Sequence, residues 1–219
     1  KLTICHFFAS IKKRGHMENL QEIKTSKKRI ENKLRNREQI LNAARLVFLE
    51  IGYESCNIRD IIRRTDLASG TFYNYFKTKE EVFIALHDNA LARFRPHIKT
   101  AFEEANGDFG KFIYKAFLSY FNFKSEELLI NSHNNKILSA SANNQTPEAV
   151  ALFDEISTYL NSFCIDGKYC HINSQYLVSS CIGIAQELGR ILVKDENQSA
   201  HDLAKFSTQF VIGGILNIK

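Results

Sequence analysis

Proline and glycine are scarce in this chain, whose 219 residues include two Pro and ten Gly. Because these residues mark turns, their scarcity excludes a collagen-like chain, disfavours a turn-dense β architecture and predicts long helices. Cysteine is also sparse, and its odd count of five argues against a disulfide scaffold. The longest apolar runs, such as residues 82–86 and 210–212, are far shorter than the roughly 18 residues of a membrane-spanning helix. We therefore expect an all-α cytoplasmic protein with no membrane partner.

Sequence motifs of catalysis are missing as well. The chain has no Gly-rich phosphate loop, no Gly-x-Ser-x-Gly elbow and no His-Glu-x-x-His pair. Cys164, Cys170, His171 and Cys181 include no Cys-x-x-Cys pair and lack a chelating spacing, so reduced thiols are the better interpretation. We expect no enzyme, no cofactor and no bound metal.

Charge is distributed unevenly along the chain. The net charge is +5, but residues 1–80 carry 17 basic and 9 acidic side chains, while residues 81–219 carry 12 and 15. A basic front joined to a slightly acidic body predicts a polyanion-binding module on a neutral scaffold. Charge alone does not distinguish nucleic acid from an anionic membrane surface.

Residues 1–36 form a predicted N-terminal extension with a basic arm. Met17 is the single methionine, so we expect the native protein to begin there and residues 1–16 to be added upstream. The segment from residue 18 to residue 36 is basic because of Lys24 and residues 27–29, and it is almost free of aromatic residues. It is either a solvated tail or an arm that follows a DNA backbone.

Residues 37–82 have the pattern of a compact helical module. Apolar residues at helical spacing predict a first helix over residues 37–51, which Gly52 ends. Asn57 is placed to cap a short second helix over residues 58–65, and a third helix over residues 69–76 would bury Phe72 and Phe76. Two short helices joined by a turn and packed on a longer one describe a helix-turn-helix. A third helix with small hydrogen-bonding residues suits the major groove of double-stranded DNA.

The stretches at residues 52–61 and 67–82 resemble the DNA-binding domain of the TetR family of transcriptional regulators, through their glycine, aromatic and lysine positions. The resemblance covers about residues 37–86. It implies phosphate contacts from the second helix, base and backbone contacts from the third helix, and a lysine at the start of the fourth. The implied DNA-binding residues, with Lys77 added as a neighbouring phosphate ligand, are Asn57, Arg59, Ser69, Thr71, Tyr73, Asn74, Lys77 and Lys79.

One departure from the family pattern concerns the head of the third helix. Ala68 and Ser69 stand where the family usually has a serine followed by a basic residue. The loss of a cation there removes one phosphate or guanine contact, worth about 1 to 3 kcal/mol if it reads a base.

Residues 83–219 are predicted to form a helical effector-binding and dimerisation domain, giving about nine helices in all. Thr78 is placed to cap a fourth helix reaching towards Glu104, which Pro96 kinks or divides. Further helices are predicted at about residues 109–121, 126–140, 147–163, 173–193 and 199–218. Apolar residues in this body either pack as an ordinary core or line a site for a small hydrophobic effector, such as an acyl chain or a drug. The candidate effector-binding residues are Phe94, Phe102, Phe117, Phe121 and Tyr159.

The last two predicted helices are apolar on more than one face. Two apolar stripes on residues 173–193 indicate two partners, one the chain's own bundle and the other a second copy in a homodimer. The predicted dimer interface comprises Val178, Ile182, Ala185, Gly189, Val211 and Gly214. A two-fold dimer suits a palindromic operator with half-sites about one helical turn apart.

These features predict a homodimeric transcriptional repressor that a small apolar effector releases from a palindromic DNA operator. An alternative is a DNA-tethered regulator whose body binds protein and no small ligand. A third reading, membrane-surface binding through the basic N-terminal segment, gives no reason for the turn chemistry at residues 66–76.

Overall fold

The computed structural model describes residues 2–127, 146–163, 172–195 and 197–217, and within these ranges all regular structure is helical, as predicted. The predicted helix beyond residue 127, the loop at 143–145, and Cys164, Cys170 and His171 lie outside the described residues. The helices are α1 (Leu2–Ile51), α2 (Ile58–Ile62), α3 (Ser69–Phe72), α4 (Lys79–Ala105), α5 (Phe109–Glu127), α7 (Pro147–Ser162), α8 (Ser174–Lys194) and α9 (Ala200–Ile215).

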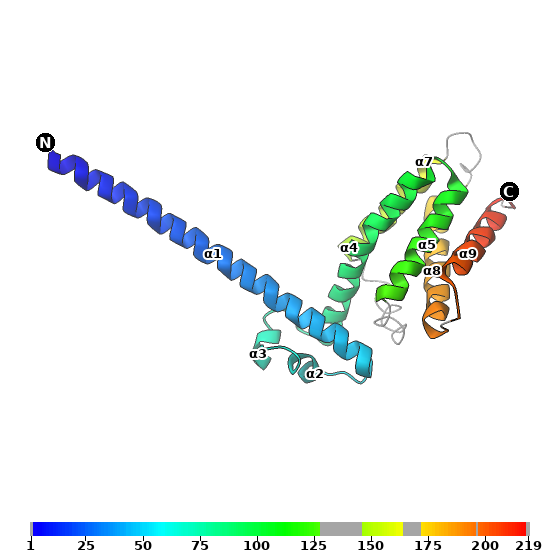
Figure 1. Ribbon diagram of the computed structural model, residues 1–219, viewed down its shortest axis with the longest axis horizontal. Coiled ribbons are helices and arrows are strands. Elements are labelled where there is room, and N and C mark those ends of the chain that lie inside the picture. The colour runs from blue at the N-terminus through cyan, green and yellow to red at the C-terminus, as the bar shows by residue number, and fades with distance from the viewer. Residues whose placement is uncertain (1, 128–145, 164–171, 196, 218–219) are drawn as a thin grey trace.

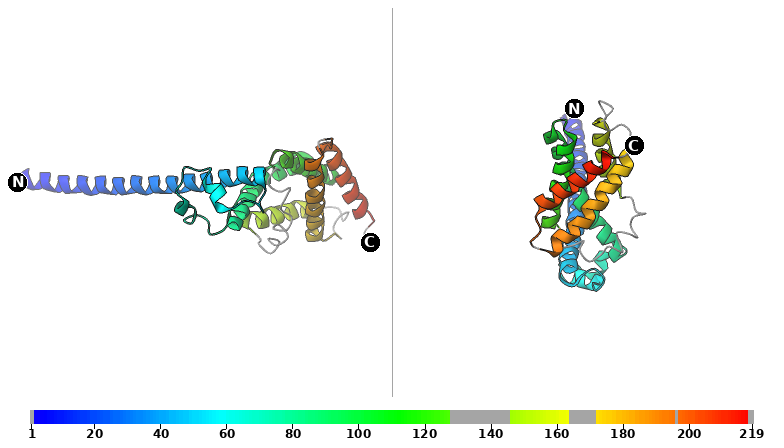
Figure 2. Two further views of the ribbon diagram at one scale, coloured as in Figure 1. Left: turned by 90° about the horizontal axis from the view of Figure 1, so that it is seen from below. Right: turned by 90° about the vertical axis from the view of Figure 1, so that its right-hand side faces the viewer.

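Helix α1 is much longer than the predicted 37–51. It runs unbroken through 50 residues, about 75 Å at 1.5 Å per residue. Residues 16–51 contain neither Gly nor Pro, so nothing in this part interrupts the helix. It ends where Gly52 adopts a φ of 78°, as the sequence predicts. The N-terminal part projects clear of the other helices, on the side away from α5, α8 and α9 (Figures 1 and 2).

The head of the molecule is built from the C-terminal half of α1, α2, α3 and the first turns of α4 (Figure 1). Its core is aromatic, with Phe48, Tyr53 and Phe83 in mutual contact at ring-centroid distances of 5.3 to 6.2 Å. Buried aliphatic side chains of α1 and α2, including Ile40 and Ile61, complete this core. The head thus has a hydrophobic core of its own.

Two predicted helix caps are confirmed in the head. The Asn57 side chain accepts hydrogen bonds from the backbone N–H groups of Arg59 and Asp60, and the Asp60 carboxylate accepts one from the Asn57 N–H. The Thr78 hydroxyl accepts from the Glu81 N–H and begins α4. These caps satisfy backbone donors that a helix start leaves unpaired.

Helix α4 connects the head to the body. It continues through Pro96 as one helix, so Pro96 does not divide it, and the alternative of a kink stays a prediction. It ends at Asn106 and Gly107, both of which have positive φ values, in the left-handed region that Asn and Gly tolerate best. One helix therefore contributes to both hydrophobic cores.

The body is a bundle in which α5 packs against α4, α8 and α9, and α7 packs against α4 and α8 (Figure 1). Aromatic residues of α4, α5 and α7 fill much of its interior. Helix α7 begins at Pro147 with Thr146 as its cap, and α9 begins after the cap Ser199. Both starts agree with the sequence prediction.

Candidate nucleic-acid interface and regulatory core

Helix α3 has a buried side and a free side. Phe72 and Phe76 are 0% and 4% exposed and hold the segment against the head core. Tyr73 is 61% exposed, and its ring lies edge-on to Phe72 at 5.4 Å. Ser69 and Asn74 are exposed as well, and Thr71 is half-buried. The buried aromatics therefore orient the polar side chains of this segment towards solvent.

The cations predicted to contact phosphate do not share one environment. Arg59 on α2 and Lys77 before α4 are exposed. The Asn57 amide oxygen is occupied as a helix cap, which leaves its NH₂ group for any DNA contact. Asn57 therefore combines a structural role with the predicted binding role.

Lys79 is engaged inside the head. Its ammonium donates hydrogen bonds to the carbonyl oxygens of Tyr53 (2.6 Å) and Cys56 (2.7 Å), and it lies 4.2 Å from the centre of the Tyr53 ring. Two of its three donors therefore hold the turn between α1 and α2 against the start of α4. The role implied by the family resemblance, a phosphate contact, is left with one donor.

Replacing Lys79 by methionine is expected to destabilise the head by about 1.5 to 3 kcal/mol, because the change leaves two partly buried carbonyls without their charged donor. Urea unfolding followed by circular dichroism measures this loss. Lys77→Met is the matched control: its side chain is exposed, so we expect unchanged stability and weaker DNA binding. Equal stability of both variants would contradict the structural role of Lys79.

Three further cations flank the recognition segment and were not among the predicted site residues. Arg37 of α1 lies over the Phe76 ring at 5.3 Å. Arg64 forms an exposed ion pair with Glu50, which ties the end of α2 to α1. Arg63 beside it is exposed. The sequence places Arg63 and Arg64 on the solvent-facing side of the second helix, so both could have been proposed as phosphate ligands. The contacts that Arg37 makes with Phe76 and Arg64 makes with Glu50 could not, because they join residues far apart in sequence.

The five candidate effector residues lie in two adjoining clusters of the body. Phe117, Phe121, Phe102 and Tyr159 belong to the larger cluster around α5. Phe94 belongs to a smaller one with Ile98 and Leu152. Tyr159 and Tyr120 contact both clusters. The five predicted residues, on α4, α5 and α7, thus share the apolar interior of the body.

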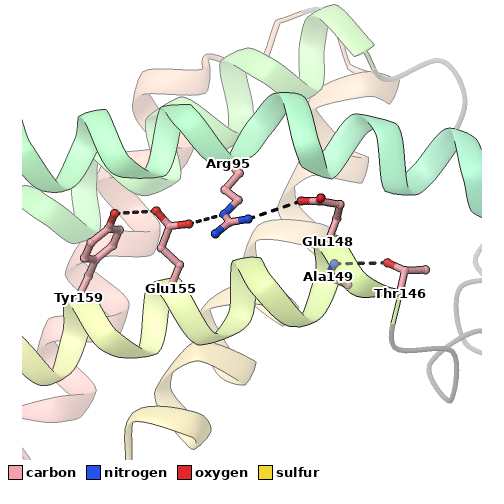
Figure 3. Close-up of polar contacts among 6 residues, drawn as sticks. All are labelled: Arg95, Thr146, Glu148, Ala149, Glu155 and Tyr159. Atoms are coloured by element: carbon pink, nitrogen blue, oxygen red, sulfur yellow. Dashed lines mark hydrogen bonds and ion pairs between the residues drawn. The ribbon is translucent and has the colours of Figure 1, made fainter. Parts of the chain in front are cut away.

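A polar network beside these aromatics joins α4 to α7 (Figure 3). Arg95 of α4 donates to the Glu155 carboxylate of α7 and lies 3.7 Å from Glu148, near the start of the same helix. The Tyr159 hydroxyl donates to Glu155 Oε1 at 2.6 Å, and the Tyr159 ring stacks on Phe102 at 4.1 Å. Sequence reasoning missed this network because Arg95 and Glu155 are 60 residues apart.

The charge states of this network are stable around neutral pH. Burial alone would raise the pKa of Glu155, but hydrogen bonds from Arg95 and Tyr159 hold that pKa below its ordinary value. Burial, with the hydrogen bond to Glu155, raises the pKa of Tyr159 to about 12. Glu155 is therefore ionised and Tyr159 protonated at neutral pH, which keeps the contacts between α4 and α7 in place.

Most of the residues predicted for the dimer interface are buried within the chain. Val178, Ala185 and Val211 are 0%, 6% and 6% exposed, and all three pack in the chain's own core. Gly189 is also buried, and Ile182 packs partly against the same core. The four buried residues offer no surface to a second copy. Val178, Ala185 and Gly189 form a periodic apolar stripe on α8 that is buried within the chain, and Gly214 alone of the predicted set is exposed.

A different apolar face is exposed on α9. Phe206 and Phe210 are 57% and 63% exposed, and their rings stack at 6.2 Å. Gly213 and Gly214 continue the face and have open space where a Cβ would lie. Among the helices that the structure describes, α8 is the one whose length and apolar composition would allow it to cross a membrane. It packs against α5, α7 and α9, so part of this apolar surface is used within the bundle.

Comparison with known proteins identifies the head. Residues 40–86 match the family model described as bacterial regulatory proteins, tetR family. The HTH-type transcriptional regulator UidR of Escherichia coli is 39% identical over 67 residues, which cover 29% of this chain and 34% of UidR. The fatty acid metabolism regulator protein of Bacillus subtilis is 38% identical over 56 residues, 26% of this chain and 29% of that protein. The chain thus spans about a third of the length of the curated relatives it matches.

Solved structures share the fold over most of the chain. The fatty acid degradation regulator FadR of Bacillus halodurans has a TM-score of 0.65 and 22% identity, over 81% of this chain and 98% of that one. FadR of Bacillus subtilis, solved with stearoyl-CoA, has a TM-score of 0.65 and 18% identity over the same shares. At these identities the likeness establishes a common architecture of head and body. The head thus matches the tetR family model over residues 40–86, and head and body together share the fold of these solved regulators.

Proposed function

We propose that the chain is a DNA-binding transcriptional regulator, a homodimeric repressor that a small apolar effector releases from a palindromic operator. The observation that carries this proposal is the orientation of α3, in which buried Phe72 and Phe76 leave Ser69, Tyr73 and Asn74 facing solvent. Residues 37–82 would bind DNA, and residues 83–219 would bind the effector and the second copy.

The DNA contacts divide into reading and positioning. Ser69, Thr71 and Asn74 carry short polar groups that suit base edges in the major groove. Tyr73, Arg59 and Lys77 reach outward from the same region and suit phosphates. Phosphate contacts fix the register of the head on the duplex, and the α3 side chains then select sequence.

The exposed face of α9 is the best candidate for the dimer contact. Two phenylalanines that are more than half exposed carry an energetic cost in water, which a second copy would remove. Gly213 and Gly214 beside them permit close approach of another helix. A two-fold axis through this face would pair like surfaces and present two heads to a palindrome.

The effector is proposed to be an acyl chain. The region between α4, α5 and α7 is rich in aromatic side chains, with Arg95 and Glu155 as its nearest paired charges. One structural neighbour is a fatty acid degradation regulator, and another was solved with stearoyl-CoA. A ligand entering between α4 and α7 would act on the Arg95–Glu155 contact, and α4 continues directly into the head.

The proposal is tested with purified protein and duplexes from its own promoter region. At about 150 mM KCl, fluorescence anisotropy should show binding at least 1,000-fold tighter to the operator duplex than to a scrambled duplex. Addition of dodecanoyl- to stearoyl-CoA should release the DNA, while CoA alone should not. Equal affinity for both duplexes would refute the DNA-binding function. Specific binding that no acyl-CoA alters would refute the acyl effector and favour the DNA-tethered regulator without a small ligand.

A further inference from the structure

The projecting part of α1 carries a concentration of positive charge. We call Thr25–Arg37 the stem. It contains one acidic residue, Glu31, and six basic ones: Lys27, Lys28, Arg29, Lys33, Arg35 and Arg37. Most of its side chains are exposed, and it lies clear of the body in both Figure 1 and Figure 2. Six cations on a helix that no other helix covers must be surrounded by water or paired with an anionic partner.

The base of the stem has a defined orientation. The Arg37 guanidinium lies over the ring of Phe76, which follows Phe72 of α3 by one helical turn's length of chain. Arg29 and Lys33 precede Arg37 by eight and four residues, so all three lie on one face of α1, within about 80° of one another. Because Arg37 points towards the recognition segment, the other two point to the same side of α1.

Within the stem, this face is a stripe of cations with no acidic residue three or four positions away from any of them. Glu31 lies about 200° around the helix from Arg29, and its carboxylate is 4.0 Å from the Lys27 ammonium. Asn32 and Asn36, which are neutral, border the stripe on one side. Successive cations are about 6 Å apart along the helix, which is close to the separation of every second phosphate at about 3.4 Å per phosphate along one DNA strand. The stripe therefore complements a phosphate backbone in both sign and spacing.

The recognition helix itself supplies no such charge. Helix α3 has the sequence Ser-Gly-Thr-Phe, which contains no charged residue. Lys79, at the start of α4, uses two of its three N–H donors in hydrogen bonds to backbone carbonyls. Nonspecific attraction to DNA must therefore come from groups around α3. The stem holds the largest run of cations in the described chain next to that helix.

We infer that the face formed by Arg29, Lys33 and Arg37 binds phosphates of the DNA adjoining the half-site that α3 reads. This inference rests on the proposed DNA-binding function and adds a second contact to it. The stem is about 20 Å long, which corresponds to about six base pairs of additional duplex beside each half-site. The DNA contact predicted for the basic arm is thereby assigned to three of its cations, which lie on one face of a rigid helix.

The test compares two charge-matched variants of the full chain. Arg29→Gln/Lys33→Gln removes two cations from the stripe. Lys28→Gln/Arg35→Gln removes two cations that lie about 150° around the helix from Lys33, and serves as the control. Each is titrated by anisotropy, between 50 and 300 mM KCl, against the operator duplex with eight flanking base pairs and against a trimmed duplex without them.

The stripe variant should bind the flanked duplex about 10- to 30-fold more weakly than the unsubstituted chain, and its slope of log affinity against log salt should fall by about 1.8 per protomer. On the trimmed duplex the two should be equal, and the control should match the unsubstituted chain on both duplexes. Circular dichroism checks that helix content is unchanged.

Equal losses in both variants would reduce the effect to net charge and overturn the inference. So would a stripe variant that binds the flanked duplex normally. The stem also exposes Ile30 and Leu34, by 58% and 59%, so sedimentation with phosphatidylglycerol vesicles is measured in parallel. Vesicle binding that the stripe variant loses, with DNA binding intact, would assign the stem to a membrane instead. In each experiment the unsubstituted chain is also measured against a scrambled duplex. This shows independently whether the chain binds its operator specifically, as the proposed function requires.

Discussion

Replacing Phe206 and Phe210 together by lysine is expected to convert the protein to a monomer and to weaken operator binding by at least 100-fold. The two rings form the stacked, exposed face of α9. Opposed lysines across a two-fold axis would repel one another and remove the apolar area that drives association. A monomer loses the gain that comes from linking two heads on one palindrome, a factor of about 10² to 10⁴. Analytical ultracentrifugation and anisotropy measure the two effects.

The control for this double variant is Val150→Lys. Val150 is 37% exposed on α7 and offers a similar apolar-to-lysine change away from the α9 face. It should leave both the oligomeric state and the DNA affinity unchanged. A Phe206→Lys/Phe210→Lys protein that still sediments as a dimer would show that the second copy binds elsewhere.

Replacing Phe72 by alanine is expected to destabilise the head by about 3 to 5 kcal/mol, the range for fully buried aromatic residues. Phe72 is completely buried and contacts both Tyr73 and Phe76, so the cavity would lie directly beneath the recognition segment. Because the body has a separate core, we expect the head to unfold first. Hydrogen exchange of peptides from residues 37–86 and 109–127 separates the two regions.

The neighbouring tyrosine is the matched control. Tyr73→Ala removes a ring that is 61% exposed, so the stability change should stay within about 0.5 kcal/mol. Its DNA affinity should nevertheless fall, because the hydroxyl and ring lie on the free side of α3. Similar stability losses in Phe72→Ala and Tyr73→Ala would contradict the division of α3 into a buried and a reading side.

The head was predictable because its signals are local. Asn57, Thr78 and Gly52 act within a few residues of the helix ends they define, and Phe72 and Phe76 are one turn apart. The start of α1 was not predictable in the same way. The prediction began at Arg37 where the apolar stripe begins, but residues 16–36 contain no helix breaker, so the helix continues beyond the core it serves.

Contacts between distant residues account for what the sequence did not reveal in the body and at Lys79. Periodicity found apolar stripes on α8, but it does not show which stripe packs in the chain's own core, and the structure places Val178 and Ala185 there. The pairing of Arg95 with Glu155 depends on how α4 crosses α7. Lys79 meets the Tyr53 carbonyl only after the turn between α1 and α2 has formed.

The two polar attachments of α4 constrain how it can move. Lys79 fixes its first turn to the head, and Arg95, sixteen residues later, fixes its middle to α7. A helix does not stretch, so this segment of about 24 Å acts as a rigid strut whose length is constant. Rearrangement at Glu155 would therefore reach the head as a change of angle, and a tilt of about 5° over that length displaces the far end by about 2 Å. In a dimer the two struts would tilt with opposite sense about the two-fold axis, so the separation of the two heads would change by about twice that displacement.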